Sequence, residues 1–247
     1  MRVTFIGTGG PTVTKKRCCS CILVDEDLLF DCGTGSVKNL RMADVDLAKL
    51  RKVLITHYHL DHISDLAPLL WTLEMEETKE PLEIAGYKTI EKVTKKLLKL
   101  MNTPEDFTVF NLKFNPLNGN ENFGEIQTFL TKHKPKNIAY RIQRGSKSLC
   151  YTGDTAFYKP LVRFVSNCNL LIHEATFLDE QKDIAVLTNH STASQAGKIA
   201  KLANVEKLVL THIFPGNDKF EDKYVKQAAK EFKGEIFVAK DFQTIDI

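Results

Sequence analysis

The chain has 247 residues, of which 43% are hydrophobic and 26% charged, and its formal net charge is +3. This length and apolar content suit one large α/β domain with a sizeable core, and they exclude a chain dominated by disorder. The net charge is too small to indicate a partner by itself, so local clusters of lysine and arginine are more informative.

Targeting and redox signals are weak. The segment Met1–Ile6 is typical of a strand rather than a signal peptide, and no apolar run approaches transmembrane length. The six cysteines show neither zinc-ribbon spacing nor a disulfide framework. Cys18, Cys19 and Cys21 crowd together, but adjacent cysteines rarely bridge each other, so a metal or redox role for them is not favoured and reduced thiols are expected. We therefore expect a cytoplasmic protein that makes no membrane contact.

Strand and helix patterns alternate through the first half of the chain. A strand at Val3–Ile6 ends in a glycine-rich loop, and a later lysine-rich amphipathic pattern from Ile90 to Met101 predicts a helix. A helix is also predicted where leucines recur at 66, 69, 70 and 73. Further strands are predicted at Cys21–Val24, Leu28–Asp31, Lys52–Thr56 and Leu82–Ala85, the first two joined by a turn at Asp25–Asp27.

The second half is richer in strands. A capping box formed by Thr192 and Gln195 predicts a helix that continues through Ala203, and a last helix is expected from Asp218 to Phe232. No linker and no repeat interrupts the pattern, so one domain over residues 1–247 is expected. The predicted strands are Phe107–Phe114, Glu125–Leu130, Ala139–Gln143, Ser148–Tyr151, Leu170–His173 and Lys207–Thr211.

All seven histidines lie in short polar motifs, the densest being His57-Tyr58-His59-Leu60-Asp61-His62. In an extended segment, residues two apart point the same way. His57, His59 and Asp61 are therefore expected to face one side, while His62 at the turn into the following helix reaches a neighbouring position. Four donors in six positions are too many for one tetrahedral zinc ion and suit two cations about 3.5–4 Å apart.

More donors follow short apolar strands elsewhere in the chain, and such strand ends converge on one edge of a sheet. Zn²⁺ is the expected metal, and the nitrogen and oxygen ligands also tolerate Mn²⁺ or Fe²⁺. The competing interpretation is a set of buried histidines paired with local carboxylates. The predicted ligands are His57, His59 and His133 for one metal, Asp61, His62 and His212 for the other, and Asp154 as the bridge.

This pattern resembles the metallo-β-lactamase superfamily, and the resemblance covers nearly the whole chain. It rests on the His57–His62 motif, on the later His133, and on Gly153-Asp154-Thr155 and Thr211-His212. The superfamily implies an α/β fold, a four-layer αβ/βα sandwich with a two-zinc centre.

Within that superfamily the chain most resembles the ribonuclease Z group of phosphodiesterases. The narrower match rests on Tyr140-Arg141-Ile142 after His133, on His173–Phe177 and on Asn189–Thr192. It implies phosphodiester hydrolysis, and homodimers are common in that group, so a homodimer is one expected state.

Two departures from the group weigh against tRNA processing. Ribonuclease Z usually carries a long arm that grips tRNA, whereas only 20 residues separate His133 from Asp154 here. The group's Pro-x-Lys-x-Arg-Asn loop is matched only loosely, at Pro11–Cys18. Neither departure affects the expected phosphodiesterase chemistry.

The motifs suggest roles in catalysis. Two metals would lower the pKa of a shared water from about 16 towards 7, and Asp61 would orient or deprotonate that water. His190 is the expected general acid, and Glu174 is expected to orient it or hold it protonated. Lys15 and Arg17 are predicted to contact substrate phosphate. His173 is interpreted as structural.

The leading function is therefore a metal-dependent phosphodiesterase that acts on RNA 3′ ends or on smaller diesters such as cyclic nucleotides. A lactonase, thioesterase or β-lactamase on the same fold is the alternative enzyme class. The expected leaving-group acid His190 argues against it, and so do the basic clusters at Lys15–Arg17 and around His133. A non-enzymatic nucleic-acid-binding protein would be expected to have a degraded ligand cluster, and this cluster is complete.

Overall fold

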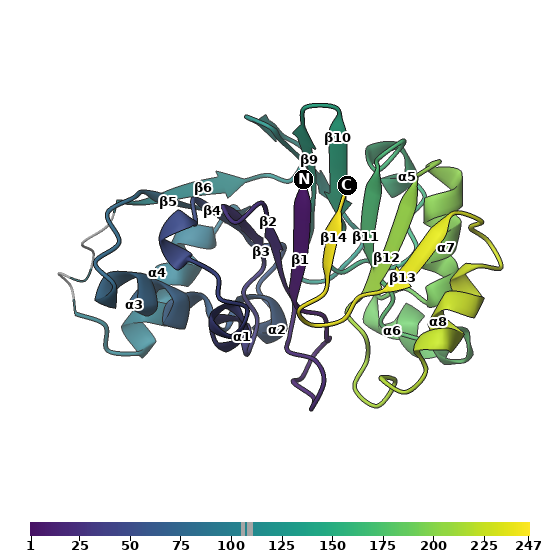
Figure 1. Ribbon diagram of the computed structural model, residues 1–247, viewed down its shortest axis with the longest axis horizontal. Helices are drawn as coiled ribbons and strands as arrows, with labels where there is room; N and C mark the ends of the chain where they lie inside the picture. Colours follow the sequence, from purple (N-terminus) through teal and green to yellow (C-terminus); the bar gives the residue numbers. More distant parts are fainter. Residues whose placement is uncertain (105–106, 108–110) are drawn as a thin grey trace.

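A computed structural model describes residues 1–104, 107 and 111–247. Its described residues form two seven-stranded β-sheets, which carry helices on their outer faces (Figure 1). The strand orders are β14-β1-β2-β3-β4-β5-β6 and β13-β12-β11-β10-β9-β8-β7.

In the first sheet, strands β3 to β6 run parallel, while β1 pairs antiparallel with both β2 and β14. A tight turn with positive φ at Asp25 and Glu26 joins β2 to β3, which is the hairpin that the sequence predicts. The strands are β1 (Arg2–Gly7), β2 (Cys21–Val24), β3 (Leu28–Phe30), β4 (Lys52–Leu54), β5 (Leu82–Tyr87), β6 (Leu112–Leu117) and β14 (Thr244–Asp246).

The second sheet has a similar plan. Strands β10 to β13 run parallel, and β9, β8 and β7 continue the sheet as antiparallel strands. The strands are β7 (Asn122–Phe123), β8 (Ile126–Leu130), β9 (Ile138–Arg144), β10 (Lys147–Tyr151), β11 (Leu170–Glu174), β12 (Lys207–Thr211) and β13 (Glu235–Val238).

The helices cover the two outer faces. Helices α3 and α4 lie at one side of the molecule, and α7 and α8 lie at the other (Figure 1). The helices are α1 (Ser36–Met42), α2 (Leu60–Ile63), α3 (Leu66–Met75), α4 (Ile90–Leu100), α5 (Leu161–Phe164), α6 (Lys182–Thr188), α7 (Ala193–Leu202) and α8 (Glu221–Ala228), with short 3₁₀ turns at Leu47–Lys49 and Asp179–Gln181.

Three apolar layers hold these elements together, as expected for a four-layer sandwich. The middle layer lies between the sheets and includes Phe5, Phe30, Tyr140 and Tyr151. One outer layer joins the first sheet to α1, α3 and α4, and the other joins the second sheet to α5, α7 and α8. The predicted αβ/βα fold is confirmed.

The parallel strands bring their carboxyl ends to one edge of each sheet, and polar residues follow several of these ends. Asp31 follows β3, His57 lies shortly beyond β4, and Asp154 lies shortly beyond β10. Glu174 ends β11 and His212 follows β12. This topology explains why residues as far apart in sequence as Asp31 and His212 can share a site.

The elements differ from the sequence expectations in a few places. The strand predicted at Phe107–Phe114 is observed as β6 from Leu112, and residues 108–110 lie outside the described part. The last helix, predicted at Asp218–Phe232, is shorter than expected. It is observed as α8 from Glu221 to Ala228, with Phe220 as its N-cap. Strands β7, β13 and β14 and helices α1, α5 and α6 were not predicted. The capping box at Thr192 and Gln195 is confirmed at the start of α7.

Within the described residues, no helix combines the length and the apolar character that crossing a membrane requires.

Candidate metal centre and active site

The first group of candidate metal ligands joins the β4–α2 loop to the β8–β9 and β10–α5 connections. Donor atoms of His57, His59, His133 and Asp154 all lie within 4.8 Å of one another. His57 Nε2 is 3.0 Å from His59 Nδ1 and 3.5 Å from Asp154 Oδ2. The structure thus brings together the three histidines that the sequence assigned to one metal.

The second group contains Asp61, His62 and His212, again with donor atoms within 4.8 Å of one another. His212 Nε2 is 3.1 Å from Asp61 Oδ2, and His62 Nε2 is 3.7 Å from the same oxygen. This is the other predicted set.

One local expectation was wrong. Asp61 was expected to lie in the same extended segment as His57 and His59, but of these three only His57 and His59 have non-helical backbone. His59 is the N-cap of α2, and Asp61 and His62 both lie within that helix. Because the chain turns into a helix after His59, Asp61 faces His212 rather than the first group.

Asp154 lies between the two groups. Its Oδ2 is 3.4 Å from His62 Nε2 and 3.8 Å from His133 Nε2, and its Oδ1 is 3.5 Å from His212 Nε2. His62 Nε2 and Asp154 Oδ1 are buried without any hydrogen-bond partner. Unpartnered buried nitrogen and oxygen atoms that face other donors fit a cation-binding site, because such atoms otherwise carry a desolvation cost.

Outer hydrogen bonds orient the imidazole rings so that Nε2 faces inward in four of them. His62 Nδ1 donates to Asp31 Oδ2 at 2.8 Å, and His133 Nδ1 donates to the Asn189 carbonyl at 3.0 Å. The hydroxyl of Thr176 lies 2.8 Å from His212 Nδ1, and that of Thr56 lies 3.1 Å from His57 Nδ1. Such partners commonly fix the tautomer of metal-binding histidines.

No role was predicted for two of these supporting residues, Asp31 and Thr176. Asp31 is fully buried and also accepts hydrogen bonds from the Thr56 backbone and the Tyr151 hydroxyl. Its position at the carboxyl end of a parallel strand was the available signal. Thr176 donates to Glu174 and contacts His190 as well as His212. Nothing in its local sequence indicates that it links three site residues.

The charges in the cluster suit cations. Burial opposes ionisation of Asp61, but its hydrogen bond to His212 and the charge of His62 hold its pKa well below the usual range. Burial lowers the pKa of His57, and the charge of His62 lowers it further. Burial also opposes the charged form of His62, but Asp154 and Asp31 outweigh it and raise the His62 pKa. That proton would have to leave before the ring could bind a metal.

His190 and Glu174 form a pair beside this cluster. His190 Nδ1 donates to Glu174 Oε1 at 2.8 Å and lies 4.0 Å from Asp154 Oδ2. Burial disfavours the charged ring, but the Glu174 and Asp154 carboxylates raise the His190 pKa to about 9. Because Nδ1 is engaged, Nε2 is the ring nitrogen that can face a substrate.

Glu174 itself is held firmly. It is fully buried and accepts hydrogen bonds from the backbone N–H groups of Thr155, Thr176 and Ser191. His173, one position earlier, is buried in the strand and donates to the Glu174 carbonyl, as its structural interpretation suggests.

The cluster opens into a pocket of about 630 Å³. Its lining includes His59, Asp61, Asp154, His190 and His212 together with several apolar side chains. The apolar lining residues are Pro11, Leu60, Phe177, Leu187 and Phe214, and Lys134 is the one lysine or arginine among the described lining residues.

The two predicted substrate-binding residues lie elsewhere. Arg17 is buried, and its guanidinium binds Asp218 at 2.8 Å and Glu221 at 2.9 Å. It also donates to Thr8 and to the Ala239 carbonyl. A guanidinium engaged in this way does not fit the predicted phosphate contact, and a structural role fits better. Lys15 is exposed and does not line the pocket.

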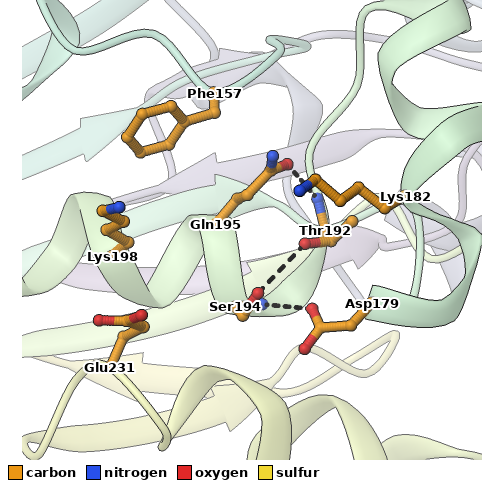
Figure 2. A pocket seen from close by; sticks show the side chains of 8 residues that line it. All are labelled: Phe157, Asp179, Lys182, Thr192, Ser194, Gln195, Lys198 and Glu231. Carbon is orange, nitrogen blue, oxygen red and sulfur yellow. Dashed lines mark hydrogen bonds between the residues drawn. The ribbon is translucent and has the colours of Figure 1, made fainter.

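A second pocket lies away from the candidate metal centre, beside the N-terminus of α7 (Figure 2). The Ser194 backbone N–H donates to Asp179, and the Thr192 N–H is satisfied by Gln195, so this helix start is already capped. All six cysteines are free, and none of them belongs to a ligand group found among the described residues.

Comparison with known proteins agrees with this geometry. The family model described as "Beta-lactamase superfamily domain" matches residues 26–213. The chain belongs to the beta-lactamase superfamily. This stretch begins in the β2–β3 turn, includes most of the candidate site, and ends one residue beyond His212.

Relatives within the superfamily narrow the resemblance. The chain is 27% identical to ribonuclease Z of Archaeoglobus fulgidus, with 100% of this chain and 97% of the relative covered. It is 29% identical to ribonuclease Z of Nitrosopumilus maritimus, with 100% of both chains covered. The first alignment spans 302 positions although this chain has 247 residues, so that relative contains segments that this superfamily member lacks.

Solved structures show the same resemblance. The metallo-beta-lactamase fold protein YhfI from Bacillus subtilis has a TM-score of 0.84 and 28% identity, covering 99% of this chain and 98% of its own. The short form of human tRNase Z has a TM-score of 0.82 and 26% identity, covering 100% and 99%. The fold, the ligand cluster and these relatives identify this beta-lactamase superfamily member as a metal-dependent hydrolase resembling the ribonucleases Z.

Proposed function

We propose that this protein hydrolyses phosphodiester bonds with a pair of divalent cations held by the two ligand groups. The observation that carries the proposal is the position of Asp154 between the groups, with the His190–Glu174 pair directly beside it. Two ligand groups that share one carboxylate suit two-metal hydrolysis. A histidine that carries a proton at neutral pH suits protonation of a leaving oxygen.

The ligand set has the chemistry of a zinc or manganese site, with imidazole nitrogens and carboxylate oxygens and no thiolate. His57, His59 and His133 would hold one cation, Asp61, His62 and His212 the other, and Asp154 would bridge them. The cations would supply a nucleophilic water of lowered pKa and would offset charge on the phosphoryl oxygens.

The protein's own groups would do the rest. Asp61 would orient the attacking water, because its carboxylate faces the pocket next to His212. His190 Nε2 would give its proton to the leaving alkoxide, and Glu174 would keep the ring charged and oriented until that transfer. Lys134, an exposed residue of the pocket lining, is well placed to attract the substrate's negative charge.

We propose an RNA 3′ end as the substrate. This chain matches two ribonucleases Z, and the matches cover 97% and 100% of the lengths of those relatives. One observation favours smaller diesters as a second candidate. Strands β9 and β10 form a hairpin joined by a two-residue turn at Gly145 and Ser146, so no arm extends from this connection. The lactonase or thioesterase alternative is not favoured.

Steady-state kinetics would test this proposal. Specificity constants of the zinc- and manganese-loaded protein should be measured on a precursor tRNA with a 3′ trailer and on 2′,3′- and 3′,5′-cyclic nucleotides. Cleavage at the trailer boundary supports RNA 3′-end processing, and cyclic-diester turnover alone supports a nucleotide phosphodiesterase. Hydrolysis of a lactone or thioester in preference to either diester would overturn the proposal.

Three further expectations stay predictions. We propose that residues 1–247 fold as one domain, since all three apolar layers draw on widely separated parts of the chain. We also propose a cytoplasmic location with reduced cysteines, and a homodimer as the form to test first by light scattering.

A further inference from the structure

Helix α4 presents a basic surface that the metal centre does not use. Its exposed residues include four lysines and one glutamate, and Lys88, two residues before the helix, is a fifth exposed lysine. Glu91 pairs with Lys95 at 2.6 Å, and both side chains are exposed, so this pair is weak. We call the five lysines the α4 lysine face; they are Lys88, Lys92, Lys95, Lys96 and Lys99.

The positive charge of this face is largely uncompensated. Over residues 1–104, 107 and 111–247, no ion pair forms at Lys92, Lys96 or Lys99. Lys88 lies close enough to Glu121 to help lower the pKa of that carboxyl, so its charge is partly balanced. A surface with several cations and one weakly paired carboxylate favours a polyanionic partner.

The lysine face is held on a rigid element. The inner side of α4 packs on the first sheet through buried Ile90 and Thr94 and half-buried Val93 and Leu97. Lysines at positions 92, 96 and 99 recur at spacings of four and three, so they share one side of the helix. With a rise of 1.5 Å per residue they span about 10 Å, enough for about three phosphates of one strand.

The face also begins at the edge of the sheet that carries the metal ligands. Lys88 directly follows β5, whose carboxyl end lies at that edge. The hydroxyl of Tyr58, which stands between His57 and His59, donates to the carbonyl of Tyr87 at the end of β5. Helix α4, which carries four of the five lysines, lies on the side of the molecule opposite α8 (Figure 1).

We propose that the α4 lysine face binds the phosphate backbone of an RNA whose 3′ end enters the metal centre. This inference rests on the proposed function, which makes RNA the substrate, and adds the surface that holds the body of the RNA. The contact is electrostatic and independent of base sequence, because lysine ammonium groups recognise phosphates as point charges.

A charge-matched pair of variants tests this proposal in the metal-loaded protein. The first is Lys92→Gln with Lys96→Gln and Lys99→Gln. The control is Lys201→Gln with Lys226→Gln and Lys233→Gln, which removes the same charge from exposed positions on and near α7 and α8. Both are assayed on a trailer-bearing RNA and on bis(p-nitrophenyl) phosphate, which is too small to reach α4 from the site.

The first variant should raise KM for the RNA on the order of 10–100-fold near 0.15 M salt, and its kcat should stay unchanged. The salt dependence of log(kcat/KM) should become less steep by about 2–3, whereas the control should match the wild type. Turnover of the small diester should be the same in all three proteins.

An equal loss in both variants, or no loss in the first, would overturn the proposal. So would a loss of binding to vesicles containing anionic lipid while RNA kinetics stay unchanged. If the wild type hydrolyses neither substrate, the proposed function fails separately; binding of a labelled RNA to the same variants then decides whether the lysine face recognises RNA.

Discussion

At the scale of single residues, the arrangement around His190 explains how one histidine can serve as an acid among histidines that would bind metal. Glu174 fixes its Nδ1 and, with Asp154, raises its pKa to about 9. The neighbouring His57 and His59 have no carboxylate as close as Glu174 is to His190, and burial lowers their pKa values. The same side chain type therefore has two roles, because different partners surround it.

The first prediction concerns the leaving group. His190→Ala should retain its metal content but lose about 10²–10⁴-fold in kcat on RNA, whose leaving alkoxide needs a proton. On bis(p-nitrophenyl) phosphate the loss should be much smaller, because nitrophenolate leaves without protonation. Metal analysis and kinetics on both substrates measure this difference. Equal losses on the two substrates would remove His190 from the acid role.

The second prediction concerns pH. His190 is protonated below its pKa of about 9, so acid catalysis is present at neutral pH and is lost as pH rises through that value. Glu174→Gln removes the larger of the two charges that raise this pKa, so the alkaline limb of the kcat profile should move to lower pH. Bound cations would lower the pKa in both proteins, which leaves the sign of the difference unchanged. An alkaline limb at the same pH in the variant would contradict the pairing.

At the scale of elements, the site depends on a close contact between the loop after β3 and helix α2. This contact leaves no room for a side chain at Gly33. A Cβ atom added at Gly33, just after β3, would lie 2.0 Å from the carbonyl oxygen of Asp61. The same loop receives a hydrogen bond from Asp65 and donates one to the His62 carbonyl. The loop after β3 therefore positions helix α2 and its two candidate ligands.

The third prediction follows from this contact. Gly33→Ala should displace α2 and weaken metal binding, which isothermal titration with Zn²⁺ would measure. Gly197→Ala is the control, because its added Cβ would lie 2.4 Å from the Ala228 carbonyl between α7 and α8, away from the ligands. Overpacking there should cost about 1–3 kcal/mol of stability while leaving metal affinity unchanged. Undiminished metal affinity in Gly33→Ala would show that α2 does not depend on this contact.

Local patterns predicted most of these elements. The alternating and apolar runs predicted β2, β3 and β8 to β12. The polar residues at the ends of several strands indicated a shared site at one edge of the sheets. The turn of Asp61 into α2 was missed, because a histidine N-cap is unusual and the preceding residues favour an extended chain. Strand β14 was missed because its pairing with β1 joins the two ends of the chain and leaves no local signal.

At the scale of the whole molecule, partly buried ion pairs of one arginine connect segments that are far apart in sequence. Arg17 in the N-terminal loop binds Asp218 and Glu221 and donates to the Ala239 carbonyl. Arg17 was predicted to contact substrate phosphate, because it belongs to the basic cluster Lys15-Lys16-Arg17. Only the folded structure shows that the guanidinium of Arg17 is already paired with acidic residues that are distant in sequence.

The fourth prediction tests this structural role. Arg17→Met should lower the free energy of unfolding by about 3 kcal/mol, because two acidic side chains lose their buried partner. KM for a diester substrate should stay unchanged. Lys15→Met is the matched control, and since Lys15 is exposed it should change neither quantity appreciably. Urea unfolding and steady-state kinetics provide the two measurements. A raised KM with unchanged stability in Arg17→Met would restore the phosphate contact.

The most direct test of the two-metal account is to titrate the chelated, metal-free protein with Zn²⁺ or Mn²⁺ while following diester hydrolysis. We predict that activity returns only as the second equivalent per chain binds, and that Asp154→Ala, which lacks the bridging carboxylate, loses metal and activity together. Full activity in the metal-free protein, or wild-type activity in Asp154→Ala, would contradict a centre in which Asp154 joins two cations.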